Sequence, residues 1–274
     1  MQAGLKKNSV QETLLIPLRA RAEFSRRHPE LFFDPDALRL ARKLGLGPSG
    51  HGASGYSGLL YAVRQDALIA SARRYLELRP EATVVNLGCG LDSTGRTCDN
   101  GSCRIYNLDF PDVIAVRNEL LPAGEREENI PCDLNNPSRF ENIDASGGAV
   151  FFAAGVFYYF LKEQVKELVE AMADAFPGGV LVFDAANAKA VKLMLKTWLK
   201  DAEIKDVGAY FAVSDAKSEI GAWDSRLRVS SRGYMLGYND LKDPSVSGFF
   251  RLLARVGDGM MNMQIVKIGF GGKK

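Results

Sequence analysis

The stretch VVNLGCGLDS, residues 84–93, decides the fold class of this 274-residue chain. A short apolar run ends in Gly88-Cys89-Gly90, the pattern of a buried strand that turns tightly into a helix beside a ligand. Glycine suits such a turn because it has no Cβ to keep the ligand away from the backbone. Taken alone, the motif indicates either a nucleotide-like ligand or a simple strand-to-helix turn.

An acidic residue follows at the spacing that a ribose requires. Asp109, in IYNLDFPDV, lies 19 residues after Gly90 at the end of the next predicted strand. A carboxylate there can accept hydrogen bonds from both ribose hydroxyls. The alternative is a solvated aspartate that caps the helix beginning at Pro111, a role that Asp112 could share. Together the turn and the acid favour a nucleoside site.

The residues after the turn argue against a pyrophosphate. A dinucleotide fingerprint has a third glycine three residues after the second, and Ser93 stands there. A phosphate-binding loop of the Gly-Lys-Ser/Thr kind is absent from the sequence. The pattern therefore indicates a nucleoside without phosphates.

Two later strand ends add candidate contacts. Asp133, in PCDLNN, ends the third predicted strand, where its carboxylate can accept from an adenine amine and the next backbone amide can donate to a ring nitrogen. The alternative is an ordinary loop aspartate. In FFAAGVFYYF, Gly155 allows close approach of a ligand, and Tyr158 and Tyr159 follow where a substrate would meet it. The two tyrosines could equally be core aromatics.

Apolar runs alternate with amphipathic segments from residue 82 onward, which predicts an α/β fold with a parallel sheet covered on both faces. Strands are expected at 82–88, 103–110, 129–134, the start of 148–160, 180–187 and 260–270. Helices are expected at 161–179, 188–202 and 244–259, and a short helix followed by a strand within 218–236.

The first 80 residues are predicted to be mostly helical. A helix over 11–30 is interrupted by Pro17, and a second over 34–46 starts at Asp34 and ends at Gly45 or Gly47. The glycine-rich segment 47–58 is expected to be a mobile loop, and 59–80 a helix. We expect a helical cap at 1–80 and a core at 81–274. Within the core an insertion near 187–225 carries Tyr210, Phe211 and Trp223, which either line an acceptor pocket or pack the insertion onto the sheet.

Composition excludes several classes of protein. The formal net charge is +2, from 35 basic and 33 acidic residues, which predicts no nucleic-acid partner and no anionic membrane surface. The sequence has no apolar run long enough for a membrane span and no signal-type leader, so we expect a cytoplasmic protein. Cys98-x4-Cys103 fits no zinc pattern, and His28 and His51 are the only histidines, so no metal and free thiols are expected.

The order of these motifs resembles the class I S-adenosylmethionine-dependent methyltransferases, and more narrowly the leucine carboxyl methyltransferase and polyketide O-methyltransferase superfamily. The resemblance is carried from about residue 12 to the last strand by TLLIPLRARAE, YAVRQDAL, VVNLGCGLDS, YNLDFPDVIAVR, PCDL and AAGVFYYFLKEQVKELV. It implies a Rossmann-like, seven-stranded, mostly parallel sheet with an antiparallel last strand. It also implies S-adenosylmethionine as cofactor.

The resemblance also implies roles for individual residues. Arg64, in AVRQD, matches the family's arginine that pairs with the methionine carboxylate, a task suited to a guanidinium; the alternative is an exposed helix arginine. The other positions matched to cofactor contacts are Gly88, Cys89, Gly90, Asp109, Phe110, Cys132, Asp133, Leu134 and Gly155. The chain departs from the family at Ala154, where a glutamate often stands.

The implied activity is O-methylation of a carboxyl or hydroxyl group on a small, polyketide-like metabolite. A carboxylate acceptor is already nucleophilic and needs no base, whereas a hydroxyl needs one. His51 and Tyr56, in the glycine-rich segment, join Tyr158 and Tyr159 as candidate substrate contacts, although His51 could be a surface residue. A non-catalytic cofactor-binding protein and an NAD-linked oxidoreductase remain alternatives. A protein C-terminus is a possible but less favoured acceptor, and the sequence indicates no oligomeric state.

Overall fold

The computed structural model describes residues 14–47, 54–136, 138–194, 211–235 and 246–272. Its centre is a seven-stranded sheet in the order β3-β2-β1-β4-β5-β7-β6. The strands are β1 (Thr83–Leu87), β2 (Arg104–Asp109), β3 (Glu127–Pro131), β4 (Ala149–Ala153), β5 (Val180–Ala185), β6 (Leu227–Gly233) and β7 (Gln264–Phe270).

The strand directions agree with the expected mostly parallel sheet. β1 pairs in parallel with β2 and β4, β2 with β3, and β4 with β5. β7 pairs antiparallel with both β5 and β6, so the last strand alone reverses direction among the seven. The central strands β1 and β4 are buried along their whole length, as expected for parallel strands covered on both faces.

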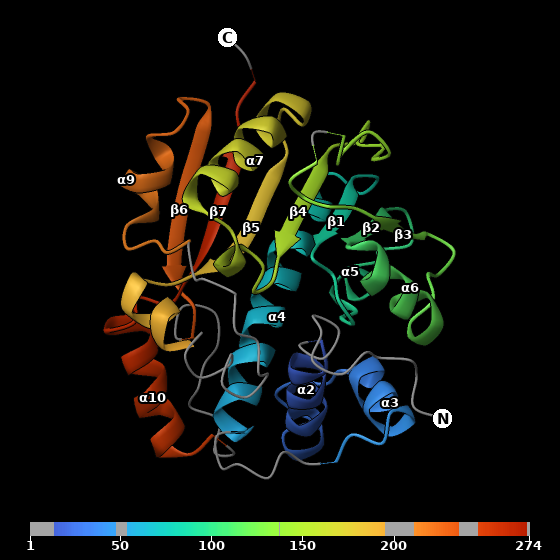
Figure 1. Cartoon of the computed structure of the whole chain (residues 1–274), viewed down its shortest axis with the longest axis vertical. Helices are drawn as coiled ribbons and strands as arrows, with labels where there is room; N and C mark the ends of the chain where they lie inside the picture. The colour runs from blue at the N-terminus through green and yellow to red at the C-terminus, as the bar shows by residue number, and fades with distance from the viewer. Residues whose placement is uncertain (1–13, 48–53, 137, 195–210, 236–245, 273–274) are drawn as a thin grey trace.

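Side chains alternate between two apolar layers along the central strands. Val84 and Phe152 face a layer that includes α4 (Ser54–Leu78) and α10 (Gly248–Gly259). Val85 and Phe151 face the opposite layer, with α7 (Lys162–Ala175) and α9 (Ala216–Gly221). Figure 1 shows α7 crossing one face of the sheet and α4 passing behind the other. Helices therefore cover both faces, as the sequence predicts.

The N-terminal helices form a third apolar cluster beside the sheet. α2 (Leu15–Arg27) and α3 (Pro35–Lys43) pack through Leu18 and Leu40 against Leu91 and the end of α6 (Pro111–Leu120). In Figure 1 the strands β4, β5 and β6 run toward the half of the molecule that holds α2, α3 and α10. α4 packs on α2 as well as on the sheet, and the proposed division at residue 80 stays a prediction.

The capping expected for α3 is confirmed. The Asp34 side chain accepts a hydrogen bond from the Ala37 amide at 2.8 Å, and Pro35 occupies the first turn. Gly45, with φ of +65°, follows the last turn in the left-handed conformation that commonly ends a helix.

Two predictions about the N-terminal region are wrong. Pro17 does not interrupt the first helix, because it lies in the first turn of α2, where a backbone amide has no partner in the helix. Residues 54–58 are not loop but the start of α4. A Cβ on Gly58 would lie 3.0 Å from the Phe24 Cβ, so this glycine allows α4 to approach α2 closely.

The remaining elements follow the predicted order. The short helix and strand expected within 218–236 are α9 and β6, and α5 (Thr94–Thr97) is a short addition after the glycine turn. Of the helix predicted over 188–202, residues 188–194 are helical and the rest lie outside the described residues. In the part of the chain that the structure describes, no helix has both the length and the apolar character needed to cross a bilayer.

Candidate cofactor site

The turn after β1 has the geometry that its glycines predict. Gly88 and Gly90 have φ of +63° and +47°. A Cβ on Gly88 would lie 2.6 Å from a methyl group of Val156, so the turn and the segment after β4 approach closely. The Cys89 amide donates to the Leu108 carbonyl at 3.0 Å, which joins the turn to β2. Only glycine fits at position 88 without strain.

Asp109 lies beside this turn but does not cap the next helix. Its Oδ2 accepts from the Gly90 amide at 2.8 Å and its Oδ1 from the Phe110 amide at 2.8 Å, whereas α6 has no side-chain cap. Burial raises the pKa of the Asp109 carboxyl, although these two amides oppose the rise. The helix-cap interpretation is therefore wrong. The ribose role stays a prediction.

Two buried arginines, which the sequence did not indicate, donate hydrogen bonds to backbone carbonyls of the turn. Arg117 Nη1 donates to the carbonyls of Gly90 and Asp92 at 2.9 and 2.8 Å. Arg21 Nη2 donates to the Leu91 carbonyl at 3.1 Å. Spacing along the chain offers no signal for these contacts, because they join residues between 25 and 70 positions apart.

Gly95, rather than the residue at position 93, allows the helix after the turn to pack closely on the sheet. A Cβ on Gly95 would lie 2.7 Å from Ile105 Cγ2, so this glycine brings α5 close to β2. In a dinucleotide fingerprint the third glycine allows the same close packing of helix and strand. The close packing of α5 on β2 is therefore present in this chain, but it occurs at Gly95 rather than at position 93.

The segment after β3 runs beside Asp109. β3 ends at Pro131, so Asp133 lies two residues beyond the strand rather than at its end. The Cys132 amide donates to the Asp109 carbonyl at 2.7 Å, which fixes where the segment begins. Asp133 is exposed and accepts from the Asn135 backbone and side chain, while Cys132 and Leu134 are buried. An exposed carboxylate between two buried neighbours remains compatible with an adenine contact.

Arg64 has a buried partner that the sequence did not indicate. Its Nη1 lies 3.2 Å from Asp184 Oδ2, and the two residues are 7% and 3% exposed. Asp184 Oδ1 accepts from the Gly155 amide at 2.6 Å. A Cβ on Gly155 would lie 2.7 Å from Arg64 Nη1. The alternative of an exposed helix arginine is thus wrong, and Arg64 lies directly against the segment after β4.

Charge and aromatic contacts surround this guanidinium. Burial lowers the pKa of Arg64 and is the largest single cause, but the Asp184 carboxylate and three nearby tyrosines together outweigh it, and the net change is upward. The Arg64 guanidinium carbon lies 4.9 Å from the centre of the Tyr61 ring, a cation–π contact, and burial raises the pKa of Tyr61 to about 12. Arg64 therefore remains charged at any physiological pH.

The two candidate substrate tyrosines differ in exposure. Tyr158 is buried, and its hydroxyl lies close to the Asp184 carboxylate, although it makes no hydrogen bond of standard geometry with any described residue. Burial raises its pKa well above the ordinary value, and the nearby Asp184 carboxylate raises it further. Tyr159 is 42% exposed, and burial of its hydroxyl end raises its pKa as well. Both phenols are protonated at neutral pH.

Other candidate residues lie elsewhere or outside the described part of the chain. His51 and Tyr210 lie outside the described residues, and nothing is described of the Tyr56 side chain, which belongs to the first turn of α4. Phe211 is 1% exposed and packs on the rings of Phe157, Phe183 and Trp223. Phe211 and Trp223 therefore pack onto the sheet.

The four cysteines are buried thiols. Cys89, Cys98, Cys103 and Cys132 are free and buried. Burial raises the pKa of each thiol, to about 12 for Cys98 and about 11 for Cys132, so thiolates are disfavoured. In the described ranges, no group of three or more histidine, cysteine or acidic residues has the arrangement of a metal site.

The strand order with one reversed strand, and a glycine turn at the carboxyl end of β1, define a Rossmann-like methyltransferase fold. A family model described as leucine carboxyl methyltransferase matches residues 15–173, more than half of the chain. The chain belongs to this family and is an S-adenosylmethionine-dependent methyltransferase.

Individual proteins resemble this chain in sequence or in fold. The chain is 27% identical over 186 residues to the tetracenomycin polyketide synthesis O-methyltransferase TcmP of Streptomyces glaucescens, which spans 68% of this chain and 69% of that protein. A solved DUF574 family protein from Streptomyces avermitilis has a TM-score of 0.56, with 11% identity over 92% of this chain and 97% of that one.

A second solved structure has the same fold. The plantazolicin methyltransferase BpumL, in complex with a triazolic desmethylPZN analog and SAH, has a TM-score of 0.51 with 12% identity, covering 96% of this chain and all of that one. At such identities the two structures show the fold alone.

Proposed function

We propose that the protein methylates an oxygen atom, of a carboxyl or hydroxyl group, on a small polyketide-like metabolite. The observation that carries the proposal is the 27% identity to a polyketide O-methyltransferase over two thirds of both chains. The family to which the chain belongs uses S-adenosylmethionine, so nothing supports the alternative of an NAD-linked oxidoreductase.

The described residues fit the cofactor in three places. Gly88 and Gly90, in positive-φ conformations, leave room for a ligand to approach the backbone of the turn. The Asp109 carboxylate, held by two backbone amides, would accept from the ribose hydroxyls. Arg64 would hold the methionine carboxylate, with Asp184 fixing its guanidinium beside Gly155.

The residues proposed to contact the cofactor are, in full, Arg64, Gly88, Cys89, Gly90, Asp109, Phe110, Cys132, Asp133, Leu134 and Gly155. Asp184 joins them as the partner of Arg64. It provides a carboxylate near the position where relatives often have a glutamate and this chain has Ala154.

The electrostatics of the site favour a carboxylate acceptor over a phenol. S-adenosylmethionine, when bound, supplies a methyl group on a sulfonium whose neutral product needs no proton to leave. Tyr158 and Tyr159 have raised pKa values and cannot act as bases at neutral pH. A carboxylate is already ionised at neutral pH and needs no base. We therefore rank a carboxyl group first and a hydroxyl group second.

A transfer assay tests the proposal. Purified protein is incubated with methyl-labelled S-adenosylmethionine and matched pairs of aromatic acceptors that carry either a carboxyl or a phenol group. Label in an ester or ether product supports the proposal, and the pair that reacts identifies the oxygen. Label found only on nitrogen or carbon acceptors would refute O-methylation while leaving the family assignment intact.

A further inference from the structure

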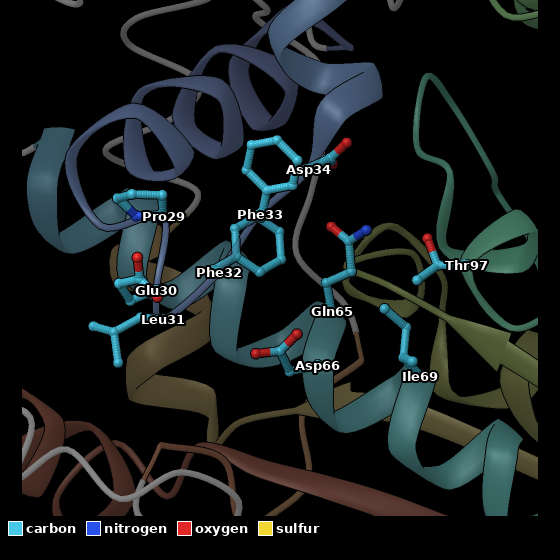
Figure 2. A pocket seen from close by; sticks show the side chains of 10 residues that line it. All are labelled: Pro29, Glu30, Leu31, Phe32, Phe33, Asp34, Gln65, Asp66, Ile69 and Thr97. Atoms are coloured by element: carbon cyan, nitrogen blue, oxygen red, sulfur yellow. The ribbon is translucent and has the colours of Figure 1, made fainter.

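A cavity lies between the N-terminal helices and the middle of α4. Its volume is about 290 Å³, and its lining comes from the connection between α2 and α3, from α4 and from the end of α5 (Figure 2). Successive residues of a helix are about 100° apart, so Asp66 is directed roughly opposite to Arg64 on α4. None of its lining residues belongs to the candidate cofactor site.

One wall of the cavity is apolar and partly aromatic. Phe32, Phe33 and Ile69 line it, and Phe33 is 62% exposed whereas Phe32 and Ile69 are buried. A large exposed aromatic ring beside a hollow offers a surface for the apolar part of a ligand.

Two adjacent polar side chains of the lining, Gln65 and Asp66, offer acceptor oxygens. Gln65 is 6% exposed, yet its Oε1 has no hydrogen-bond partner within the described part of the chain. Asp66 is half-buried next to it, and burial raises the pKa of its carboxyl to about 6, with Arg73 opposing the rise. Figure 2 shows both side chains directed toward the side of the cavity where Phe32 lies.

The net charge of the lining is negative. Glu30 and Asp34 also line the cavity, and its described lining contains no lysine, arginine or histidine. Asp34 is already paired with Arg21 and the Ala37 amide, so the exposed Glu30 and the adjacent Gln65 and Asp66 provide the acceptor oxygens left for a ligand.

We propose that this cavity binds a small primary ammonium compound with an apolar or aromatic body. The ammonium group would donate to Gln65 Oε1 and to the Asp66 carboxylate, and the body would pack on Phe32, Phe33 and Ile69. The buried Gln65 oxygen has no donor, which is unfavourable, and an ammonium group would satisfy it while pairing with the charge of Asp66. The proposal does not depend on the cofactor contacts, because the cavity and the candidate cofactor site share no residue.

The direct test uses three probes of one shape in a calorimetric titration at pH 8. 2-Phenylethylammonium carries the cation, 2-phenylethanol is its neutral counterpart and 3-phenylpropionate its anionic one. We expect binding of the ammonium probe to be about tenfold tighter than that of the alcohol, and no binding of the anion. Equal affinity for all three, or no binding of the ammonium, would overturn the proposal.

Variants locate the binding site. Asp66→Asn keeps the shape of the side chain and removes its charge, and it should weaken binding of the ammonium probe about tenfold. Glu77→Gln removes an exposed carboxylate from the same helix outside the cavity and should leave binding unchanged. Gln65→Leu, which removes the unpartnered oxygen, keeps the proposal testable if Asp66→Asn fails to fold. An unchanged affinity in a folded Asp66→Asn would contradict the proposal.

Two further readouts separate this cavity from the cofactor site. Saturating S-adenosylhomocysteine should not displace the ammonium probe; displacement would place the probe in the cofactor site and refute the inference. Wild-type affinity should fall as the pH is lowered from 8 to 5, because Asp66 loses its charge near pH 6. The charged groups that share the cavity with Asp66 or interact with it are Glu30, Asp34 and Arg73, and the same decline in Asp66→Asn would overturn the role of Asp66.

Discussion

At the scale of single residues, the pair formed by Arg64 and Asp184 changes how the cofactor site must be tested. The sequence indicates Arg64 as a ligand for a carboxylate, but the structure shows that it already has a buried carboxylate partner 3.2 Å away. Removing one member of a buried ion pair leaves the other charge without compensation. A loss of cofactor binding in an Arg64 variant therefore has to be separated from a loss of folding.

We expect Arg64→Ala to weaken binding of S-adenosylhomocysteine by about tenfold or more, because a charge-assisted hydrogen bond is lost. The same change should lower the free energy of unfolding by about 3–5 kcal/mol, since Asp184 is left buried and unpaired. Calorimetry and urea unfolding measure the two effects. Arg74→Ala, at an exposed position on the same helix, is the control and should change neither. Wild-type affinity in folded Arg64→Ala would remove the proposed contact with the methionine carboxylate.

The raised pKa of Asp66 also predicts a pH-dependent stability. A carboxyl whose folded pKa is about 6 binds its proton more tightly when folded, so its contribution favours folding at low pH. That contribution is lost as the pH rises through 4 to 6. Asp66→Asn should therefore match wild type near pH 4 and exceed it by about 1–2 kcal/mol at pH 8, allowing for partial exposure of the side chain.

Urea unfolding of wild type and Asp66→Asn at both pH values measures this difference. Glu77→Gln, an exposed site on the same helix, should show no difference at either pH. An equal gap between Asp66→Asn and wild type at pH 4 and pH 8 would show that Asp66 titrates normally.

At the scale of elements, the glycine turn could be predicted because its signal is local. An apolar run followed by Gly-x-Gly is contained in a few residues, and both glycines adopt positive φ. The contacts that hold the turn could not be predicted, because Arg21 and Arg117 reach it from other helices. Asp184 was missed for the same reason, since its partner Arg64 is 120 positions away.

The errors at residues 54–58 and at Pro17 have a different origin. Glycine lowers helix propensity, so GPSGHGASGYSG favoured a loop throughout, but tertiary packing of Gly58 on Phe24 favours the helix there. Proline breaks a helix only where a backbone amide is needed, and position 17 is in the first turn. Local propensity therefore failed where tertiary contact or position within the helix decided the structure.

The turn itself offers a prediction with an internal control. Gly88→Ala should lower the free energy of unfolding by more than Gly101→Ala, because only the first adds a clash to the backbone strain. Both glycines have positive φ, of +63° and +86°, but a Cβ at 88 would lie 2.6 Å from Val156, whereas one at 101 has open space. Strain alone costs about 1–2 kcal/mol, and the clash should add to it.

Unfolding of Gly88→Ala with and without Val156→Ala measures the added part. The double variant should recover part of the loss, because the methyl groups that clash are removed. Equal losses of unfolding free energy for Gly88→Ala and Gly101→Ala would mean that the turn does not make a close contact with Val156.

At the scale of the whole molecule, the sheet could be predicted from alternating strand and helix patterns, and its order follows from the fold that those patterns resemble. Parallel strands such as β1 and β4 are apolar throughout, which gives them a clear signal. The reversed direction of β7 came from the family resemblance, because a single strand carries no mark of its direction. The cavity beside α4 is formed by three segments that are distant in the sequence, 29–34, 65–69 and residue 97. No local pattern predicts such a cavity.

The cofactor links the whole fold to one measurement, the thermal midpoint of unfolding. A ligand that binds only the folded chain stabilises it by RT ln(1 + [L]/Kd), which is about 2.7 kcal/mol at 100 times Kd. For a domain of this size that corresponds to a rise of about 5–10 °C. We expect S-adenosylhomocysteine to produce this rise, and NADH to produce none, because Ser93 and Gly95 build a turn without the dinucleotide spacing.

Asp109→Asn should reduce the rise, since one of the two amides held by its carboxylate loses its acceptor and the ribose loses a charged partner. Glu119→Gln, an exposed change on α6, is the control and should keep the full rise. A full rise in Asp109→Asn would mean that the ribose is held by other groups, and a rise with NADH would bring back the dinucleotide interpretation of VVNLGCGLDS.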